Sequence, residues 1–148
     1  MTPPVPNDPG PYDFVLDAAV AVAWVLPVLA SVYTDNVQSA ILRKKAIVPA
    51  MWLADVAQAV RAAERRRRAT PAYVDGKLAG LAGFPIGIDD ETAVRLWSDI
   101  LVLSRTHRVT VADAAYLELA LRRRLPLATT DAALAAAAAS AGVPIYSP

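Results

Sequence analysis

The sequence predicts a single α/β domain with a central, mainly parallel sheet. Short runs rich in Val and Ile alternate along the chain with longer segments of helical spacing, and this alternation is typical of β-α-β units. The 148 residues suit one domain and are too few for two enzymatic ones. Hydrophobic residues make up 55% of the chain and charged residues 20%, which excludes a disordered polymer.

The predicted strands are short apolar runs that end at polar or turn-forming residues. We expect them to form a sheet of four or five strands. They cover Phe14–Leu16, Ala46–Val48, 85–88, 126–128 and 144–146.

The segments between these strands are predicted to be helical. Pro71 starts one helix, and Gly142 followed by Pro144 ends the last. Acidic residues at 89–91 and basic residues at 105–108 complement the dipole of another helix. The predicted helices cover 20–25, 28–43, 51–67, Pro71–Leu81, 89–106, Val111–Arg123 and Ala132–Ala141.

Two further segments decide the domain boundary and the cellular location. The proline-rich residues 1–12 are interpreted as a flexible leader before a single domain at 13–148. Residues 18–34 carry no charge, but Pro27 interrupts them and no basic residue precedes them. We therefore expect a cytoplasmic protein without a membrane segment.

The composition leaves carboxylates as the reactive groups. There is no cysteine, which excludes disulfides and thiolate sites, and the lone His107 at a helix end argues against histidine-rich metal sites. The net charge of +1 excludes binding to nucleic acid by bulk charge. Trp24, Trp52, Trp97 and Tyr116 lie in apolar helical patterns and are predicted to belong to the core.

Four acids follow predicted strands or open predicted helices: Asp17, Asp55, Asp113 and Asp131. Loops at the carboxyl ends of parallel strands converge on one crevice. A like-charge pair 4 Å apart costs roughly 4 kcal/mol at an effective dielectric of 20, so such a cluster implies a cation. Carboxylate oxygens suit Mg²⁺ or Mn²⁺, which helps activate a water nucleophile against a phosphodiester.

Structural roles are open for three of these acids. Asp55 could mark the solvated face of its helix. Asp113 lies three residues after Thr110, as in a capping box, and Asp131 precedes an alanine-rich helix as a natural N-cap. Asp17 stands alone in an apolar stretch, so a structural role explains it least well.

Taken together, the acidic segments resemble PIN-domain ribonucleases of the VapC toxin type. Residues 14–24 (FVLDAAVAVAW) resemble the first acidic motif of that family, and 48–57 (VPAMWLADVA) the second. Residues 111–120 (VADAAYLELA) and 125–134 (LPLATTDAAL), followed by AGVP at 141–144, resemble the third and fourth. The similarity runs from about residue 13 to the end of the chain.

This resemblance implies a three-layer α/β/α fold with one acidic pocket. It implies endonucleolytic cleavage of structured RNA, dependent on Mg²⁺ or Mn²⁺, by the toxin of a toxin–antitoxin pair, with a cognate antitoxin and a homodimer as partners. Asp17, Asp113 and Asp131 would hold the metal directly or through water. Asp55 would be a second-line ligand or a water-orienting base.

Departures from the family pattern leave an alternative open. Asp55 stands where Glu is usual, Gln58 where Asn is usual, and Ala19 where a hydroxyl residue is common. The alternative is a catalytically weakened relative that binds an antitoxin-like partner. An unrelated nucleotide-binding domain is disfavoured, because there is no glycine-rich phosphate loop. The family often has an acid in the segment 27–30, which is apolar here. This apolar segment indicates a surface that is covered by another protein, in a dimer or by an antitoxin.

Two basic clusters are candidate RNA contacts, because guanidinium groups bind phosphate through two hydrogen bonds. Both lie toward helix ends, where cations are favoured in any case. The candidates are Arg65, Arg66, Arg67, Arg68, Arg122, Arg123 and Arg124.

Overall fold

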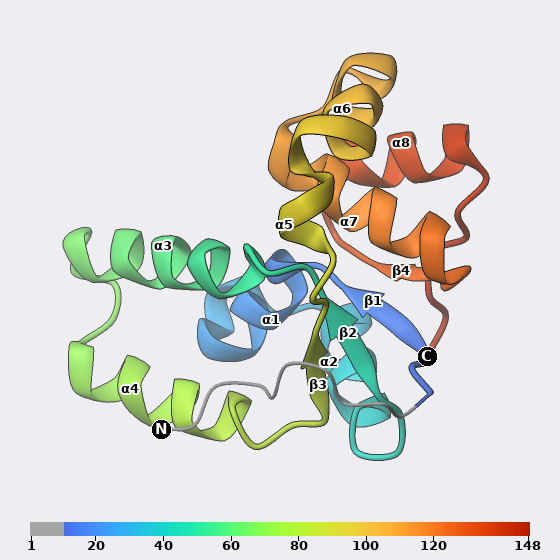
Figure 1. Ribbon diagram of the computed structural model, residues 1–148. Helices are drawn as coiled ribbons and strands as arrows, with labels where there is room; N and C mark the ends of the chain where they lie inside the picture. The colour runs from blue at the N-terminus through green and yellow to red at the C-terminus, as the bar shows by residue number, and fades with distance from the viewer. Residues whose placement is uncertain (1–10) are drawn as a thin grey trace.

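A four-stranded parallel sheet forms the centre of the computed structural model, which describes residues 11–148 (Figure 1). The strands stand in the order β3-β2-β1-β4, and every neighbouring pair is parallel. Their bounds are β1 Phe14–Leu16, β2 Ala46–Val48, β3 Ile86–Ile88 and β4 Leu127–Ala128. The predicted parallel α/β fold is therefore confirmed, with four strands.

The first half of the chain covers one face of the sheet. From β1 to β3 the chain steps across the sheet in one direction, and right-handed crossovers then put the connecting helices on the same face. α1 lies at the centre of this layer and packs against α2, α3 and α4. The elements are α1 Ala18–Val25, the 3₁₀ turn η1 Pro27–Leu29, α2 Val32–Ala40, α3 Trp52–Arg65 and α4 Pro71–Leu81.

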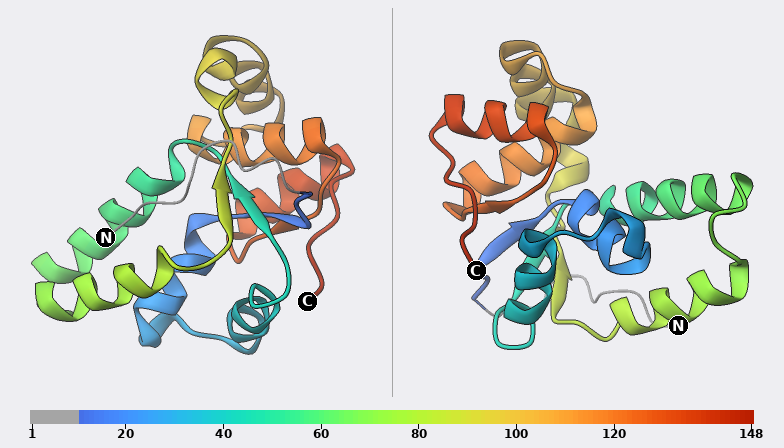
Figure 2. Two further views of the ribbon diagram at one scale, coloured as in Figure 1. Left: turned by 60° about the horizontal axis from the view of Figure 1, so that its bottom comes forward. Right: turned by 180° about the vertical axis from the view of Figure 1, so that it is seen from behind.

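The second half covers the other face, because the chain returns from β3 across the sheet to β4. α7 packs on β1, α8 packs on α7, and Figure 2 shows this group on the opposite side of the sheet from α3 and α4. The elements are α5 Thr92–Arg95, the π-helical turn η2 Leu96–Ile100, α6 Leu101–His107, α7 Val111–Arg123 and α8 Ala132–Ala141.

The helices α4, α7 and α8 match the predicted bounds because their ends carry local signals. Thr70 caps α4 by accepting a hydrogen bond from the Tyr73 amide, and Pro71 follows it. Gly142 ends α8 in the left-handed conformation, with φ of 79°. Arg124 ends α7 in the same conformation, with φ of 56°.

Three element predictions are corrected. The helix expected at 28–43 is two elements, because the Ser31 side chain starts α2 with a capping box shared with Thr34. The helix expected at 89–106 begins only at Thr92 and contains the π-helical turn. The strand expected at 144–146 is reduced to one bridge, between Leu127 and Ile145.

The prediction that Trp97 belongs to the core is wrong. Trp24 and Trp52 are buried, but Trp97 is 94% exposed. In this region Ile100 packs with Ala114 and Ala115 of α7, while Trp97 faces away. The wider π-helical turn changes which residues share a face, and the packing partner α7 decides which face is buried.

Only the last two residues of the expected leader at 1–12 belong to the described part of the chain; the rest lies outside it. Tyr12 packs against the core, and a side chain at Gly87 of β3 would collide with its ring. The folded domain thus includes Tyr12. Within residues 11–148, no helix has the length and apolarity needed to cross a bilayer.

Candidate metal-binding site

Asp17 directly follows β1 at the carboxyl edge of the sheet and is the N-cap residue of α1. Its side chain is buried, with 5% of the residue exposed. The Thr129 hydroxyl donates a hydrogen bond to Asp17 Oδ2 at 2.7 Å. Burial raises the pKa of Asp17 from 3.8 to about 6; the Thr129 hydrogen bond opposes this rise, and the charges of Asp113 and Asp131 add to it.

Asp131 lies beside Asp17 because β4, which precedes it, is paired with β1. It caps α8 as predicted, since Asp131 Oδ1 accepts a hydrogen bond from the Leu134 amide at 2.9 Å. The Thr129 hydroxyl also accepts a hydrogen bond from the Asp131 amide at 3.0 Å. One threonine therefore ties the first acid to the loop that carries the fourth.

Asp113 lies in the first turn of α7. Thr110 caps this helix as predicted and accepts a hydrogen bond from the Asp113 amide at 3.1 Å. Burial and the charges of Asp131 and Asp55 raise the pKa of the Asp113 carboxyl, while Thr110 opposes them. Asp113 is thus electrostatically coupled to acids on either side of it.

Asp55, in the first turn of α3, completes the group. It is half-buried, and the Tyr116 hydroxyl of α7 donates a hydrogen bond to Asp55 Oδ2 at 2.9 Å. Burial raises the pKa of Asp55, and this hydrogen bond opposes the rise. Gln58, one turn along, is exposed.

The structure therefore brings the four predicted acids together at one edge of the sheet. The pKa of Asp17, Asp55 and Asp113 is raised, chiefly by burial, and the charges of neighbouring acids add to the rise for Asp17 and Asp113. Neighbouring carboxylates repel one another when they are charged, and a cation would stabilise them.

The donor set fits a hard divalent cation bound partly through water. All the candidate ligands are oxygens, as Mg²⁺ and Mn²⁺ prefer. Within the described residues no three acidic side chains are close enough to hold one ion together. Mg²⁺ usually retains several waters and takes only one or two carboxylates directly, so the oxygen donors fit it by their chemistry.

Known structures share this fold. A chain of PAE2754 from Pyrobaculum aerophilum aligns with a TM-score of 0.65 and 20% identity, over 85% of this chain and 79% of that one. FitAcB from Neisseria gonorrhoeae aligns with a TM-score of 0.53 and 18% identity, over 91% of this chain and 97% of that one. No protein-family model and no curated protein sequence matches. The likeness shows the fold, a three-layer PIN-like arrangement.

Sequence reasoning missed Thr129 and the polar role of Tyr116. The core prediction for the Tyr116 ring is confirmed, since the residue is 1% exposed, but its hydroxyl lies among the acids. One signal could have found it: Tyr116 follows Asp113 by three residues, so both lie on one face of α7. Thr129 had a similar signal, two residues before the cap Asp131.

The two basic clusters differ in the structure. Arg65 to Arg68 are all exposed where α3 ends. Arg122 instead makes five hydrogen bonds to three acids, Asp89, Glu91 and Glu118. A guanidinium has five N–H groups, so Arg122 has no donor left for a phosphate.

Asp89, which was expected only to complement a helix dipole, is therefore the buried centre of an ion-pair network. Its side chain is 0% exposed and lies 2.7 Å from Arg122 Nη2. Burial raises the pKa of this carboxyl, but hydrogen bonds from Arg122 and Thr92 outweigh burial and lower it.

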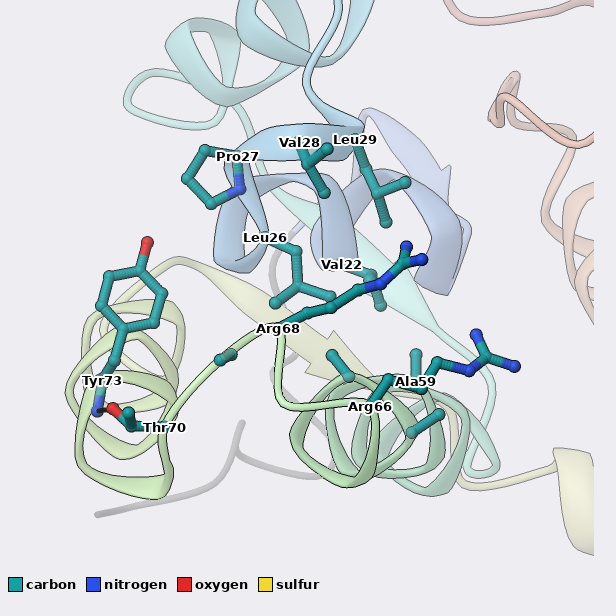
Figure 3. A pocket seen from close by; sticks show the side chains of 13 residues that line it. Val22, Leu26, Pro27, Val28, Leu29, Ala59, Arg66, Arg68, Thr70 and Tyr73 are labelled. Atoms are coloured by element: carbon teal, nitrogen blue, oxygen red, sulfur yellow. Dashed lines mark hydrogen bonds between the residues drawn. The ribbon is translucent and has the colours of Figure 1, made fainter.

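An apolar groove lies apart from the acids, between η1, α3 and α4 (Figure 3). Its volume is about 570 Å³. Val28 and Leu29 of η1 line one side, 79% and 54% exposed; Arg66 and Arg68 also line the groove, and Figure 3 shows the Arg68 side chain reaching across it toward Val22. Three residues of the segment 27–30, which the sequence predicted to be a surface covered by protein, thus form one wall of a groove with a basic rim: Pro27, Val28 and Leu29.

Proposed function

We propose that this protein is a metal-dependent endoribonuclease and the toxin component of a toxin–antitoxin pair. The observation that supports this most is the convergence of four carboxylates, Asp17, Asp55, Asp113 and Asp131, at the carboxyl edge of a parallel sheet. The PIN-like fold and the resemblance of the same four segments to VapC ribonucleases support the choice of RNA as substrate.

The residues would act as follows. Mg²⁺ or Mn²⁺ bound there would stabilise the negative charge on the phosphodiester and lower the pKa of a water nucleophile. Asp17, Asp113 and Asp131 would hold the ion directly or through water, and Thr129 would orient Asp17. Asp55 would orient the attacking water, since its raised pKa makes it a better proton acceptor than an ordinary aspartate.

Phosphate contacts are proposed for the exposed arginines Arg65, Arg66, Arg67 and Arg68, and for Arg123 and Arg124 at the C-terminal end of α7. Arg122 is excluded by its five hydrogen bonds to acids. A homodimer stays a prediction from the family resemblance.

Cleavage of total RNA by the purified protein tests the proposal. With Mg²⁺ or Mn²⁺ we expect discrete products, and with EDTA we expect none, because the carboxylates cannot supply this chemistry without a cation. Product ends are mapped by sequencing. Folded, partner-free protein that cleaves no RNA with either metal would favour the alternative, a PIN-like binding module without catalytic activity.

The groove between η1, α3 and α4 is proposed as the docking site of the antitoxin. Its apolar walls suit the apolar face of a helix, and Arg66 and Arg68 on its rim suit acidic side chains beside that face. The groove does not include the four acids, so inhibition through it would require the antitoxin to continue toward them.

Val28→Asp should weaken antitoxin binding at least tenfold, because a charge would be buried against an apolar helix. The antitoxin is first selected from a library of coding fragments as a fragment that relieves the growth arrest expected of the protein. Its binding to each variant is then measured by calorimetry. Val94→Asp is the matched control: Val94 is 78% exposed, against 79% for Val28, and lies outside the groove. Equal affinity of the two variants would remove the groove from the proposal.

A further inference from the structure

Tyr116 is a buried polar side chain to which the proposed chemistry gives no part. The residue is 1% exposed, and its hydroxyl donates to Asp55 Oδ2 at 2.9 Å, which joins α7 to α3. Burial raises the pKa of Tyr116, the charges of Asp55 and Asp17 raise it further, and a hydrogen bond with the Ala18 backbone opposes them. The hydroxyl therefore lies where α1, α3 and α7 meet, and it stays protonated as a donor.

Packing alone does not call for this hydroxyl. The ring lies in the core, where a phenylalanine would bury the same apolar surface. A buried hydroxyl is costly unless it makes a hydrogen bond, and here the acceptor is a carboxylate of the candidate site. Tyr116 also shares a face of α7 with Asp113, so one helix presents both an acid and a donor to the same region.

The effect on Asp55 follows from its surroundings. Within residues 11–148, the side-chain hydrogen bond that the Asp55 carboxylate accepts comes from the Tyr116 hydroxyl. The hydrogen bond occupies Oδ2 and leaves Oδ1 for a cation or a bound water. Asp17 likewise receives a side-chain hydrogen bond on Oδ2, from Thr129, and has a backbone hydrogen bond with Ala19 as well. Donors of this kind orient metal-binding carboxylates and tune their affinity.

We propose that Tyr116 is a positioning residue that fixes the Asp55 carboxylate, so that its second oxygen is held ready for the cation or its water. This inference rests on the proposed metal site and adds to it a residue that the sequence places in the core. Tyr116 itself touches neither metal nor substrate in this scheme.

Mn²⁺ affinity, measured from the electron paramagnetic resonance signal of free Mn²⁺, tests the inference without RNA. The four proteins are the wild type, Tyr116→Phe, Asp55→Asn and the double variant. Tyr116→Phe should weaken Mn²⁺ binding about tenfold, as loss of a residue that orients a ligand does. In the Asp55→Asn background the same change should have no further effect, because the neutral amide has already removed the charged ligand that Tyr116 positions.

Tyr73→Phe is the matched control, because Tyr73 belongs to α4 and lines the apolar groove, which does not include the acids. It should leave Mn²⁺ affinity unchanged. Circular dichroism checks folding, and Tyr116→Met replaces Tyr116→Phe if the latter loses secondary structure. Additive losses in the double variant, or no loss in Tyr116→Phe, would overturn the inference alone. A wild-type protein that binds no Mn²⁺ would instead overturn the metal site, and the inference with it.

Discussion

Replacing Asp17 by Asn should reduce RNA cleavage by more than about 100-fold, which is the upper end of the cost of losing a residue that only orients a metal ligand. Asn keeps an oxygen that can accept the Thr129 hydroxyl hydrogen bond, so the loop between β4 and α8 should hold its position. The neutral amide nevertheless removes the charge that would bind the cation. Rates with Mg²⁺ and with Mn²⁺, compared with the wild type at equal concentration, measure the effect.

The same change should stabilise the metal-free protein at neutral pH. A pKa of about 6 in place of 3.8 means that the folded state holds the charged Asp17 at a cost of about 3 kcal/mol, since a tenfold change in proton affinity corresponds to about 1.4 kcal/mol. This cost is fully present above pH 6 and disappears as pH falls toward 3.8, because the folded wild type then takes up a proton more readily than the unfolded chain.

Urea unfolding of both proteins in EDTA checks this sign. Asp17→Asn should be the more stable protein at pH 8, and its advantage should shrink at pH 5. Added Mg²⁺ should stabilise the wild type and leave the variant unchanged, because ligands that bind only the folded state stabilise it. A variant that is less stable than the wild type at pH 8, or that still cleaves RNA, would contradict the role given to Asp17.

Arg122→Met should destabilise the fold by about 3 kcal/mol at pH 7, a large share of the 5–15 kcal/mol that holds a typical domain together. The change leaves the buried carboxylates of Asp89 and Glu118, 0% and 5% exposed, without the guanidinium that pairs with both. Contacts from Arg123 to Asp89 at 3.4 Å and from Arg95 to Glu118 at 3.6 Å remain. We therefore expect the lower end of the loss in stability that follows removal of one partner from a buried ion pair.

The pH dependence of this loss has a defined sign. The pKa of Asp89 is lowered in the folded protein, so its contribution to stability is present above the ordinary pKa of aspartate and is lost as pH falls through the lowered value. The difference between wild type and Arg122→Met should therefore shrink below about pH 4. Urea unfolding at pH 7 and at pH 3 measures it, with Arg105→Met, at an exposed position on α6, as the control.

Local signals explain why much of the fold could be predicted. Strands β1 and β2 are short apolar runs bounded by polar or proline residues, and α4 and α7 begin after threonine caps. The acids Asp17 and Asp131 could be placed at one edge because each follows a strand of a parallel sheet.

Where the prediction from sequence was wrong, several apolar residues could have been buried, and tertiary packing decided which of them is. The run at 89–106 offers more apolar residues than one helix face can bury, and α7 selects Ile100 rather than Trp97. The helix expected at 28–43 begins only at Val32 for a different reason: the Ser31 and Thr34 capping box sets its start, and this local signal was present in the sequence.

The sequence by itself determined the α/β class, the parallel sheet and the four candidate acids, because strand runs, caps and helix faces are encoded within a few neighbouring residues. Only the tertiary structure decided which donor each buried acid receives. Tyr116 and Asp55 are 61 residues apart, and Arg122 and Asp89 are 33 apart. Such pairs form because helices from distant parts of the chain pack on one sheet, and burial then requires every carboxylate to find a donor.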